Sequence, residues 1–396
     1  MGRRGRPLTV IAVLAVLACA PDNAVAHTKG LTLSRFGLID VSLQSNVDYL
    51  TFDNPKRVDF DKIGDRDQKG FNLTSFDLSL TGQLPDFPLK FAMFLTFEQD
   101  KASIEEAFLF FHKLEEFSPV LSDFQATVGQ FRAKFGQFNQ IHDHEWFLED
   151  PPLIHTKFLG PDGVHLLGAE VTYQVPISTF LQFSLSVQSK GALDGYPGAT
   201  SNTPPTFALK TADDVVVFPR VETFFDLTDN TDLSLGASGA IGKNKPASND
   251  KTYLIGGDVL LRWKSGAAAF PYIRWLTEGI WAVRENPIVT AGANKGLQLG
   301  SDVVGGFFSE IGYRFSQHWQ VTGRVDYVGI PKGKEDEHLR LTGGLRYLIS
   351  TVAKIGLQYD YSAQSGRDKP YSAYFIQFSV GLGTVTPGVG KFLDPF

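Results

Sequence analysis

The chain has 396 residues and a formal net charge of −6, and this acidic balance argues against a nucleic-acid partner. Its composition combines Phe 33, Tyr 12 and Gly 39 with Met 2 and Cys 1, which is unusual for a soluble enzyme. After residue 26 no apolar run approaches the roughly 18 residues of a membrane-spanning helix, so a helical membrane protein is excluded.

The first 26 residues predict export. Arginines at positions 3, 4 and 6 precede the apolar run 8–19, and residues 24–26 form a small-x-small cleavage site. We therefore expect a signal peptide over 1–26 and a single mature unit over 27–396. Cys19 leaves lipidation open as an alternative, although Leu17 fits a lipoprotein cleavage box poorly. The mature chain then has no cysteine, as suits a barrel that crosses an oxidising periplasm unfolded.

Period-two alternation predicts strands along the rest of the chain. Between 181 and 188, for example, apolar residues at odd positions alternate with Gln or Ser at even ones. Each such run is about as long as a tilted transmembrane strand. Sixteen runs follow one another: 33–44, 71–83, 87–98, 103–113, 124–136, 163–174, 178–189, 214–226, 231–242, 252–264, 269–283, 303–315, 318–329, 337–348, 352–362 and 371–382.

The connections between these runs alternate in length. The odd ones, such as 45–70, 137–162 and 190–213, are long, whereas most even ones are short turns. Outer-membrane barrels have an even number of strands, long outside loops and short periplasmic turns. The pattern therefore predicts an all-β, 16-stranded antiparallel transmembrane β-barrel. A soluble β-sandwich is the alternative, but it does not explain this asymmetry.

The face opposite the apolar one is predicted to line a water-filled lumen, because charges on the lipid side are costly. It carries acidic as well as basic residues, so mutual pairing of these charges is as good an interpretation as a solute-orienting positive wall. The predicted pore-lining residues are Arg132, Lys134, Arg220, Arg262, Arg274, Arg314, Arg324, Arg340 and Arg346, with Lys354, Glu222, Asp258, Glu278, Glu310, Asp326 and Asp360 on the same face.

Connection 137–162 is rich in Phe, Trp, Leu and Ile, and it is the third outside loop. We expect it to fold into the lumen, pack against the inner wall and narrow the channel, with Asp143 and Glu145 lining the pore. Three histidines in or near it, His142, His144 and His155, are candidate zinc ligands. The alternative is that they hydrogen-bond to the wall and fix the loop.

The predicted last strand is followed by a tail, 383–396, which ends in Phe396. We expect this tail to lie in the periplasm. A terminal Phe is common in outer-membrane barrels, but there it ends the strand itself.

The stretch 129–136, together with the histidine loop and Asp150-Pro151-Pro152-Leu153, resembles bacterial proteins related to the phosphate-selective porins. The similarity covers about residues 104–175 and looks closest to a branch labelled zinc-regulated, TonB-dependent outer-membrane receptors. The resemblance implies a trimeric 16-stranded barrel with anion preference from Arg132 and Lys134. Two features depart from it: the loop is acidic rather than lysine-rich, and the chain leaves no room for a TonB plug domain.

The leading functional hypothesis is passive diffusion of small hydrophilic solutes through an outer-membrane channel, without cofactor or catalysis. The expected partners are outer-membrane lipid, the solutes, the barrel assembly machinery and two further copies in a homotrimer. The alternative is a pore for zinc or another metal ion that uses the histidine loop. A third hypothesis, an enzyme or adhesin, requires a plugged lumen.

Overall fold

The computed structural model describes residues 31–33, 37–52, 69–84, 87–97, 102–112, 114–189, 206–209, 213–245, 249–266, 270–286, 301–332, 337–350, 353–365 and 370–383. The predicted signal peptide and the tail from residue 384 lie outside these residues. No helix in the described ranges is long and apolar enough to cross a membrane.

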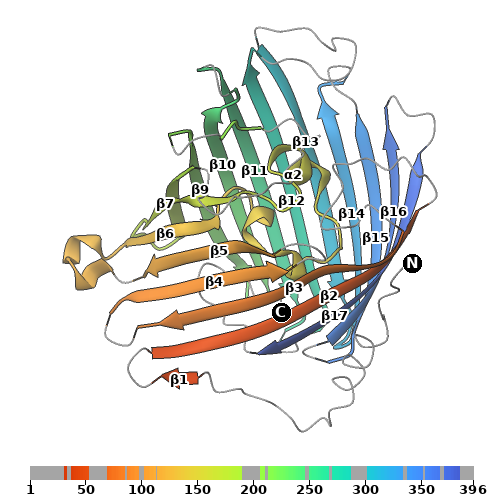
Figure 1. Cartoon of the computed structure of the whole chain (residues 1–396), viewed down its shortest axis with the longest axis horizontal. Helices are drawn as coiled ribbons and strands as arrows, with labels where there is room; N and C mark the ends of the chain where they lie inside the picture. Colours follow the sequence, from red (N-terminus) through yellow and green to blue (C-terminus); the bar gives the residue numbers. More distant parts are fainter. Residues whose placement is uncertain are drawn as a thin grey trace, which may run out of the picture.

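Sixteen long strands form one closed antiparallel sheet (Figure 1). Each pairs with its neighbour in sequence, and the last pairs with the first, with Val380 opposite Ser45. The strands are β2 (Gly37–Phe52), β3 (Gly70–Gln83), β4 (Leu89–Phe97), β5 (Ala102–Phe111), β6 (Phe124–Arg132), β7 (His165–Gln174), β8 (Phe180–Ser189), β9 (Val215–Thr228), β10 (Thr231–Lys243), β11 (Lys251–Lys264), β12 (Tyr272–Glu285), β13 (Ser301–Arg314), β14 (Trp319–Ile330), β15 (His338–Leu348), β16 (Ala353–Gln364) and β17 (Tyr371–Gly383). A short strand, β1 (Leu31–Leu33), pairs with the start of β2.

The predicted strand number is confirmed, and most predicted boundaries lie within four residues of the observed ones. The first strand extends to Phe52 instead of ending near residue 44, because Asn46 and Asp48 are buried on the inner face, where polar residues suit a strand. The fifth predicted strand ends at Arg132 instead of residue 136. Gly136, at φ +66°, turns the chain away there.

The two faces of the sheet differ as alternation requires. In β8, Phe183 and Leu185 are 47% and 51% exposed, whereas Ser184 and Ser186 between them are buried. The same contrast recurs around the barrel, with Ile255, Trp275, Ile311 and Ile376 on the exposed face. A continuous exposed apolar face of this kind is what lipid, rather than water, would contact.

The connection between β6 and β7, residues 133–164 (the β6–β7 segment), contains the described part's one α-helix, α2 (Leu153–Phe158), and two short 3-10 turns, Phe138–Gln140 and Asp143–Glu145. Helix α2 contacts β12, β13 and β14 (Figure 1). Those strands lie far from β6 and β7 around the closed sheet, so the segment reaches distant parts of the barrel.

Candidate functional site

The inner face of β9–β14 carries buried apolar residues beside the predicted charged ones. Apolar residues share it with the arginines and carboxylates. They pack with buried side chains of the β6–β7 segment into one hydrophobic core. Its wall members include Val216, Phe218, Ala240, Leu254, Leu260, Leu276, Ile280, Val304, Phe308 and Val328; its segment members include Phe135, Phe138, Trp146, Leu153, Ile154 and Phe158.

Glycines on the inner face give the segment side chains room to approach the strands. A Cβ at Gly256 would collide with Phe135, one at Gly312 with Phe147, and one at Gly344 with Leu148. A side chain larger than hydrogen at these positions would displace the segment. The segment and the wall therefore match each other in shape.

Glu278 of β12 holds two parts of the segment. Its Oε1 accepts hydrogen bonds from the backbone amides of Gln137 and Phe138, at 2.6 and 2.7 Å. Its Oε2 lies 2.8 Å from His155 Nε2. All these groups are buried, so one carboxylate satisfies polar groups that would otherwise have no partner.

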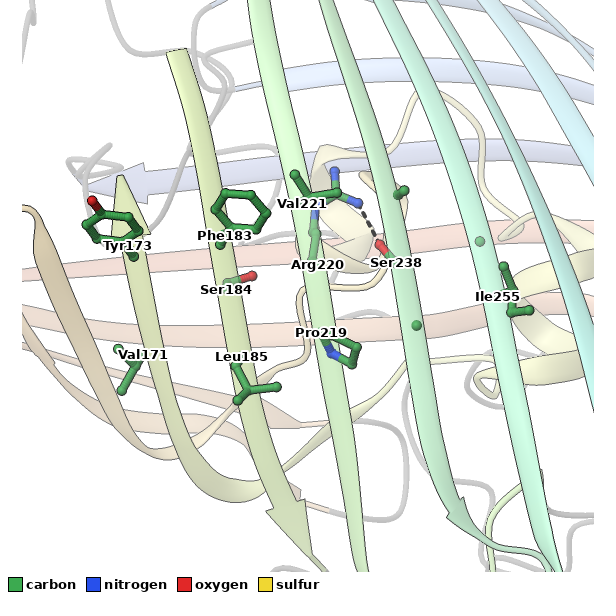
Figure 2. Close-up of a pocket in the computed structure, with 13 residues that line it drawn as sticks. Val171, Tyr173, Phe183, Ser184, Leu185, Pro219, Arg220, Val221, Ser238 and Ile255 are labelled. Atoms are coloured by element: carbon green, nitrogen blue, oxygen red, sulfur yellow. Dashed lines mark hydrogen bonds between the residues drawn. The ribbon is translucent and has the colours of Figure 1, made fainter. Parts of the chain in front are cut away.

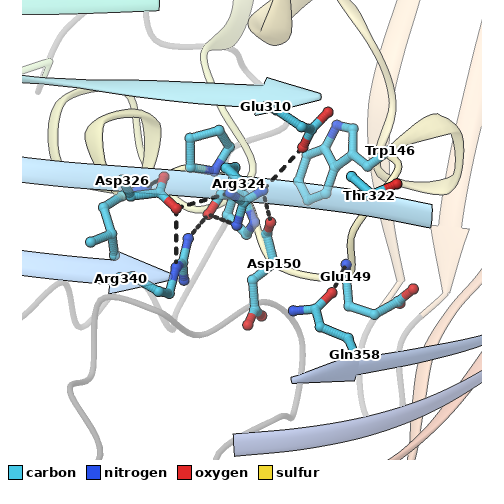
Figure 3. A network of polar contacts seen from close by, with 12 residues as sticks. Trp146, Glu149, Asp150, Glu310, Thr322, Arg324, Asp326, Arg340 and Gln358 are labelled. Carbon is cyan, nitrogen blue, oxygen red and sulfur yellow. Dashed lines mark hydrogen bonds and ion pairs between the residues drawn. The ribbon is translucent and has the colours of Figure 1, made fainter. Parts of the chain in front are cut away.

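Strands β14 and β15 hold the residues before α2 (Figure 3). Arg324 Nη1 donates to the carbonyl oxygen of Asp150 at 2.8 Å, and Arg340 Nη2 donates to that of Pro151. Asp326 Oδ1 accepts from the Leu153 amide at 2.9 Å, and its Oδ2 accepts from Arg324 Nε. The two arginines and Asp326 thus form one buried network with the segment backbone.

Three further contacts involve residues 146–149 of the segment. Arg346 Nη2 donates to the carbonyl oxygen of Trp146 at 2.9 Å, although the two residues are 200 positions apart. On β16, Gln358 Oε1 accepts from the Glu149 amide at 2.7 Å. The aromatic ring of Phe147 lies 4.8 Å below the guanidinium of Arg274.

Asn139 joins the two ends of the segment. Its side-chain amide donates to Ala133 O at 2.8 Å, and its Oδ1 accepts from the Val164 amide at 2.9 Å. Asn139 was not predicted as a site residue. In the sequence it is only a polar residue after Phe138, and such a residue has many structural uses.

The predicted basic residues are mostly paired. Arg132 pairs with Glu105, Arg220 with Asp258 at 2.6 Å, Arg262 with Asp232 at 2.7 Å and Arg274 with Glu310 at 3.2 Å. Arg314 donates to Gln317 O near the turn between β13 and β14. Lys134 follows the end of β6 rather than lying within a strand, and its Nζ lies 2.6 Å from Glu170.

The structure separates two of the three histidines. His142 lies between two carboxylates of β5, 3.2 Å from Glu105 and 3.0 Å from Glu106, whereas His155 lies beside Glu278 of β12. The side chain of His144 is outside the described part. No group of three potential metal ligands occurs among the described residues, so zinc binding gains no support. The alternative, in which histidines fix the loop, agrees with the contacts of His142 and His155.

A hollow of about 600 Å³ lies on the outer face across β7–β11 (Figure 2). Exposed apolar side chains such as Val171, Leu185 and Ile255 line it. Arg220 reaches its floor from the other side, where it donates to Ser238 at 2.7 Å. The hollow is therefore a feature of the apolar exterior and not of the inner site.

No protein-family model and no curated relative matches the chain. Solved structures do match in fold. An anion-selective porin from Comamonas acidovorans has a TM-score of 0.56 at 8% identity, over 87% of this chain and 99% of that one. The outer-membrane channel DcaP of Acinetobacter baumannii has a TM-score of 0.53 at 11% identity, over 87% and 96%.

A trimer form of the outer-membrane protein OmpT of Vibrio cholerae has a TM-score of 0.52 at 9% identity, over 88% of this chain and 100% of that one. None of these likenesses supports the zinc-regulated, TonB-dependent branch. At such low identity they establish the architecture alone. The chain has the 16-stranded antiparallel β-barrel fold of outer-membrane porins.

Proposed function

We propose that this protein is an outer-membrane channel for passive diffusion of small hydrophilic solutes, narrowed by residues 137–162. The observation that carries the proposal is the set of attachment points of the β6–β7 segment. His142 contacts β5, whereas Gln137 and His155 contact β12. In a closed sheet of sixteen strands, β5 and β12 lie on nearly opposite sides.

A segment attached to opposite sides crosses the interior of the barrel and reduces its opening. A barrel of about 16 strands is wide enough to retain an aqueous path beside such a segment. The exposed apolar exterior supports an outer-membrane location, since only a closed barrel satisfies every backbone group of strands in lipid. No residue is assigned a catalytic role.

The anion preference implied by the resemblance rests on Arg132 and Lys134. Both are paired with glutamates, Glu105 and Glu170. If the pair nevertheless orients anions, the double variant Arg132→Glu with Lys134→Glu shifts selectivity towards cations. A reversal potential that does not move removes these residues from the mechanism.

A homotrimer is part of the proposal, and the trimer form of a structurally similar protein supports it. Its mass in detergent, measured by light scattering corrected for detergent, should equal three chains. A mass of one chain would contradict the trimer and leave the channel hypothesis intact.

The central test is single-channel recording of the purified, folded protein in a planar bilayer under a salt gradient. Steady conductance steps are expected. Neutral polymers small enough to enter the channel should lower its conductance, and polymers above a sharp size cut-off should be excluded and leave it unchanged. The control is the same protein after heat unfolding. Silence from protein shown to be folded would contradict the channel.

A further inference from the structure

Three arginines of the inner wall bind the backbone of the β6–β7 segment. Arg324, Arg340 and Arg346 donate to the carbonyl oxygens of Asp150, Pro151 and Trp146. Those carbonyls lie in irregular backbone that is buried, where an unpaired carbonyl is costly. The planar guanidinium can reach a carbonyl and a carboxylate at once, which an ammonium does less well.

The charges of the same arginines are matched at short range. Asp326 Oδ2 lies 2.9 Å from Arg324 and 3.4 Å from Arg340, Glu310 lies 3.5 Å from Arg324, and Glu149 lies 3.8 Å from Arg346. The side chains of Arg324 and Arg340 are 1% and 2% exposed. Because each positive charge has a carboxylate within 4 Å, its field at a distance falls to that of a dipole. Such pairs orient a passing ion weakly.

Other charged groups near the segment are partly exposed. The side chain of Lys134 is 25% exposed, and Asp143, Glu145 and Lys354 are partly exposed as well. These partly exposed charges lie on two elements, Lys354 on β16 and the two carboxylates on the 3-10 turn Asp143–Glu145.

We propose a division of roles among the charges of the inner site. Arg324, Arg340 and Arg346 hold the segment in place, and the partly exposed Lys354, Asp143 and Glu145 set the charge selectivity of the channel. The inference rests on the proposed function for its second half. Of the two interpretations that the sequence left open, it favours mutual pairing of the arginines over a solute-orienting wall.

Four variants separate the two roles. Lys354→Gln should shift the permeability ratio towards cations, and Asp143→Asn should shift it towards anions, each by about twofold. Arg340→Gln should leave the permeability ratio unchanged but raise conductance and current noise, since the segment loses the hydrogen bond to its Pro151 carbonyl. Arg340→Lys retains the charge and loses the planar fork, so it should behave like Arg340→Gln.

Hydrogen exchange of the backbone amides from 146 to 153 supplies a second readout that needs no conductance. Exchange there should accelerate at least tenfold in both Arg340 variants and stay at the wild-type rate in Lys354→Gln. Heat-modifiable mobility in gel electrophoresis shows that each variant still forms the barrel. A variant that does not is replaced by Arg346→Gln, which loses the segment contacts with Trp146 and Glu149.

Two results would overturn the proposal. A selectivity shift in Arg340→Gln as large as that in Lys354→Gln, with normal selectivity in Arg340→Lys, would make the arginines the orienting wall. Unchanged exchange in both Arg340 variants would remove them from the attachment of the segment. If the wild type conducts no current but exchange responds as expected, the proposed function fails while the arginine attachment stands.

Discussion

Two parts of the barrel wall share one strand pattern and use their inner faces differently. Strands β12–β15 combine arginines and carboxylates with apolar residues, and both groups bind the β6–β7 segment. Strands β2, β3 and β17 contain no lysine or arginine. Their buried inner residues are mainly amides, hydroxyls and aspartates, such as Asn46, Asp48, Asn72, Asp77 and Ser379, with a small apolar cluster of Leu50, Ala373 and Phe375.

The difference shows that alternation fixes which residues point inward but not what they do there. A buried arginine beside the segment satisfies a carbonyl, whereas Asn72 on β3 satisfies Asp48 on β2 at 3.1 Å. Four predictions test this contrast between the two walls, in order of expected effect.

Truncation of a segment aromatic should have the largest effect. Phe138 packs against Trp146, His155 and Phe308. We expect Phe138→Ala to lower the free energy of local opening of the segment by about 3–5 kcal/mol, since a buried ring leaves a cavity. Native-state hydrogen exchange of amides 137–158 measures it. Phe375→Ala, an equal truncation on β17, is the control and should leave that opening free energy unchanged; an equal loss would mean that the two walls are coupled.

Loss of the Glu278 carboxylate should cost about 3 kcal/mol of the same opening free energy. Glu278→Ala leaves the amides of Gln137 and Phe138 and the ring of His155 without their partner. The control is Asp302→Ala on β13, because Asp302 bonds Arg284 of β12 at 2.6 Å. If Glu278→Ala accelerates hydrogen exchange only in β12 and β13 and leaves exchange in the segment normal, this role of Glu278 is refuted.

Placing a side chain at a glycine that the segment packs against should lower the free energy of unfolding by about 1–3 kcal/mol. A Cβ at Gly344 would lie 2.7 Å from Leu148, whereas one at the adjacent Gly343 has nothing within 4 Å. Gly344→Val should therefore displace Leu148 and the segment around it and raise single-channel conductance, and Gly343→Val should not. If the two valine variants conduct alike, the close fit of segment and wall is not what limits the opening.

The smallest effect is expected at Arg262. Its Nε donates to Asp232 Oδ1, and both side chains are partly exposed, at 18% and 26%. A partly solvated pair away from the segment contributes about 0.2–1 kcal/mol, so Arg262→Gln should leave segment exchange and conductance near wild type. Hydrogen exchange of the segment amides and bilayer recording measure these two quantities. A large change in conductance would place Arg262 among the charges that limit the channel.

The strand plan could be predicted because it depends on local patterns. The alternation 181–188 identifies an inward and an outward face without any knowledge of the partner strand, since side chains in a strand alternate with period two. Short turns such as Ser316–Gln317 then fix the antiparallel order, and an even strand number follows from counting. The predicted end of the first strand is too early, because Asn46 and Asp48 look like loop residues unless the strand is known to belong to a closed barrel with a polar inner face.

The sequence by itself determined the closed sheet, its two faces and the unusual composition of residues 137–162. Only the tertiary structure decided where that segment binds, because its contacts join residues such as Trp146 and Arg346, which are 200 positions apart. No local pattern specifies such a pairing. The pairing of the inner charges was also decided in three dimensions. A carboxylate within about 4 Å of an arginine weakens the field of that arginine at a distance, and the arginine then acts mainly as an attachment point.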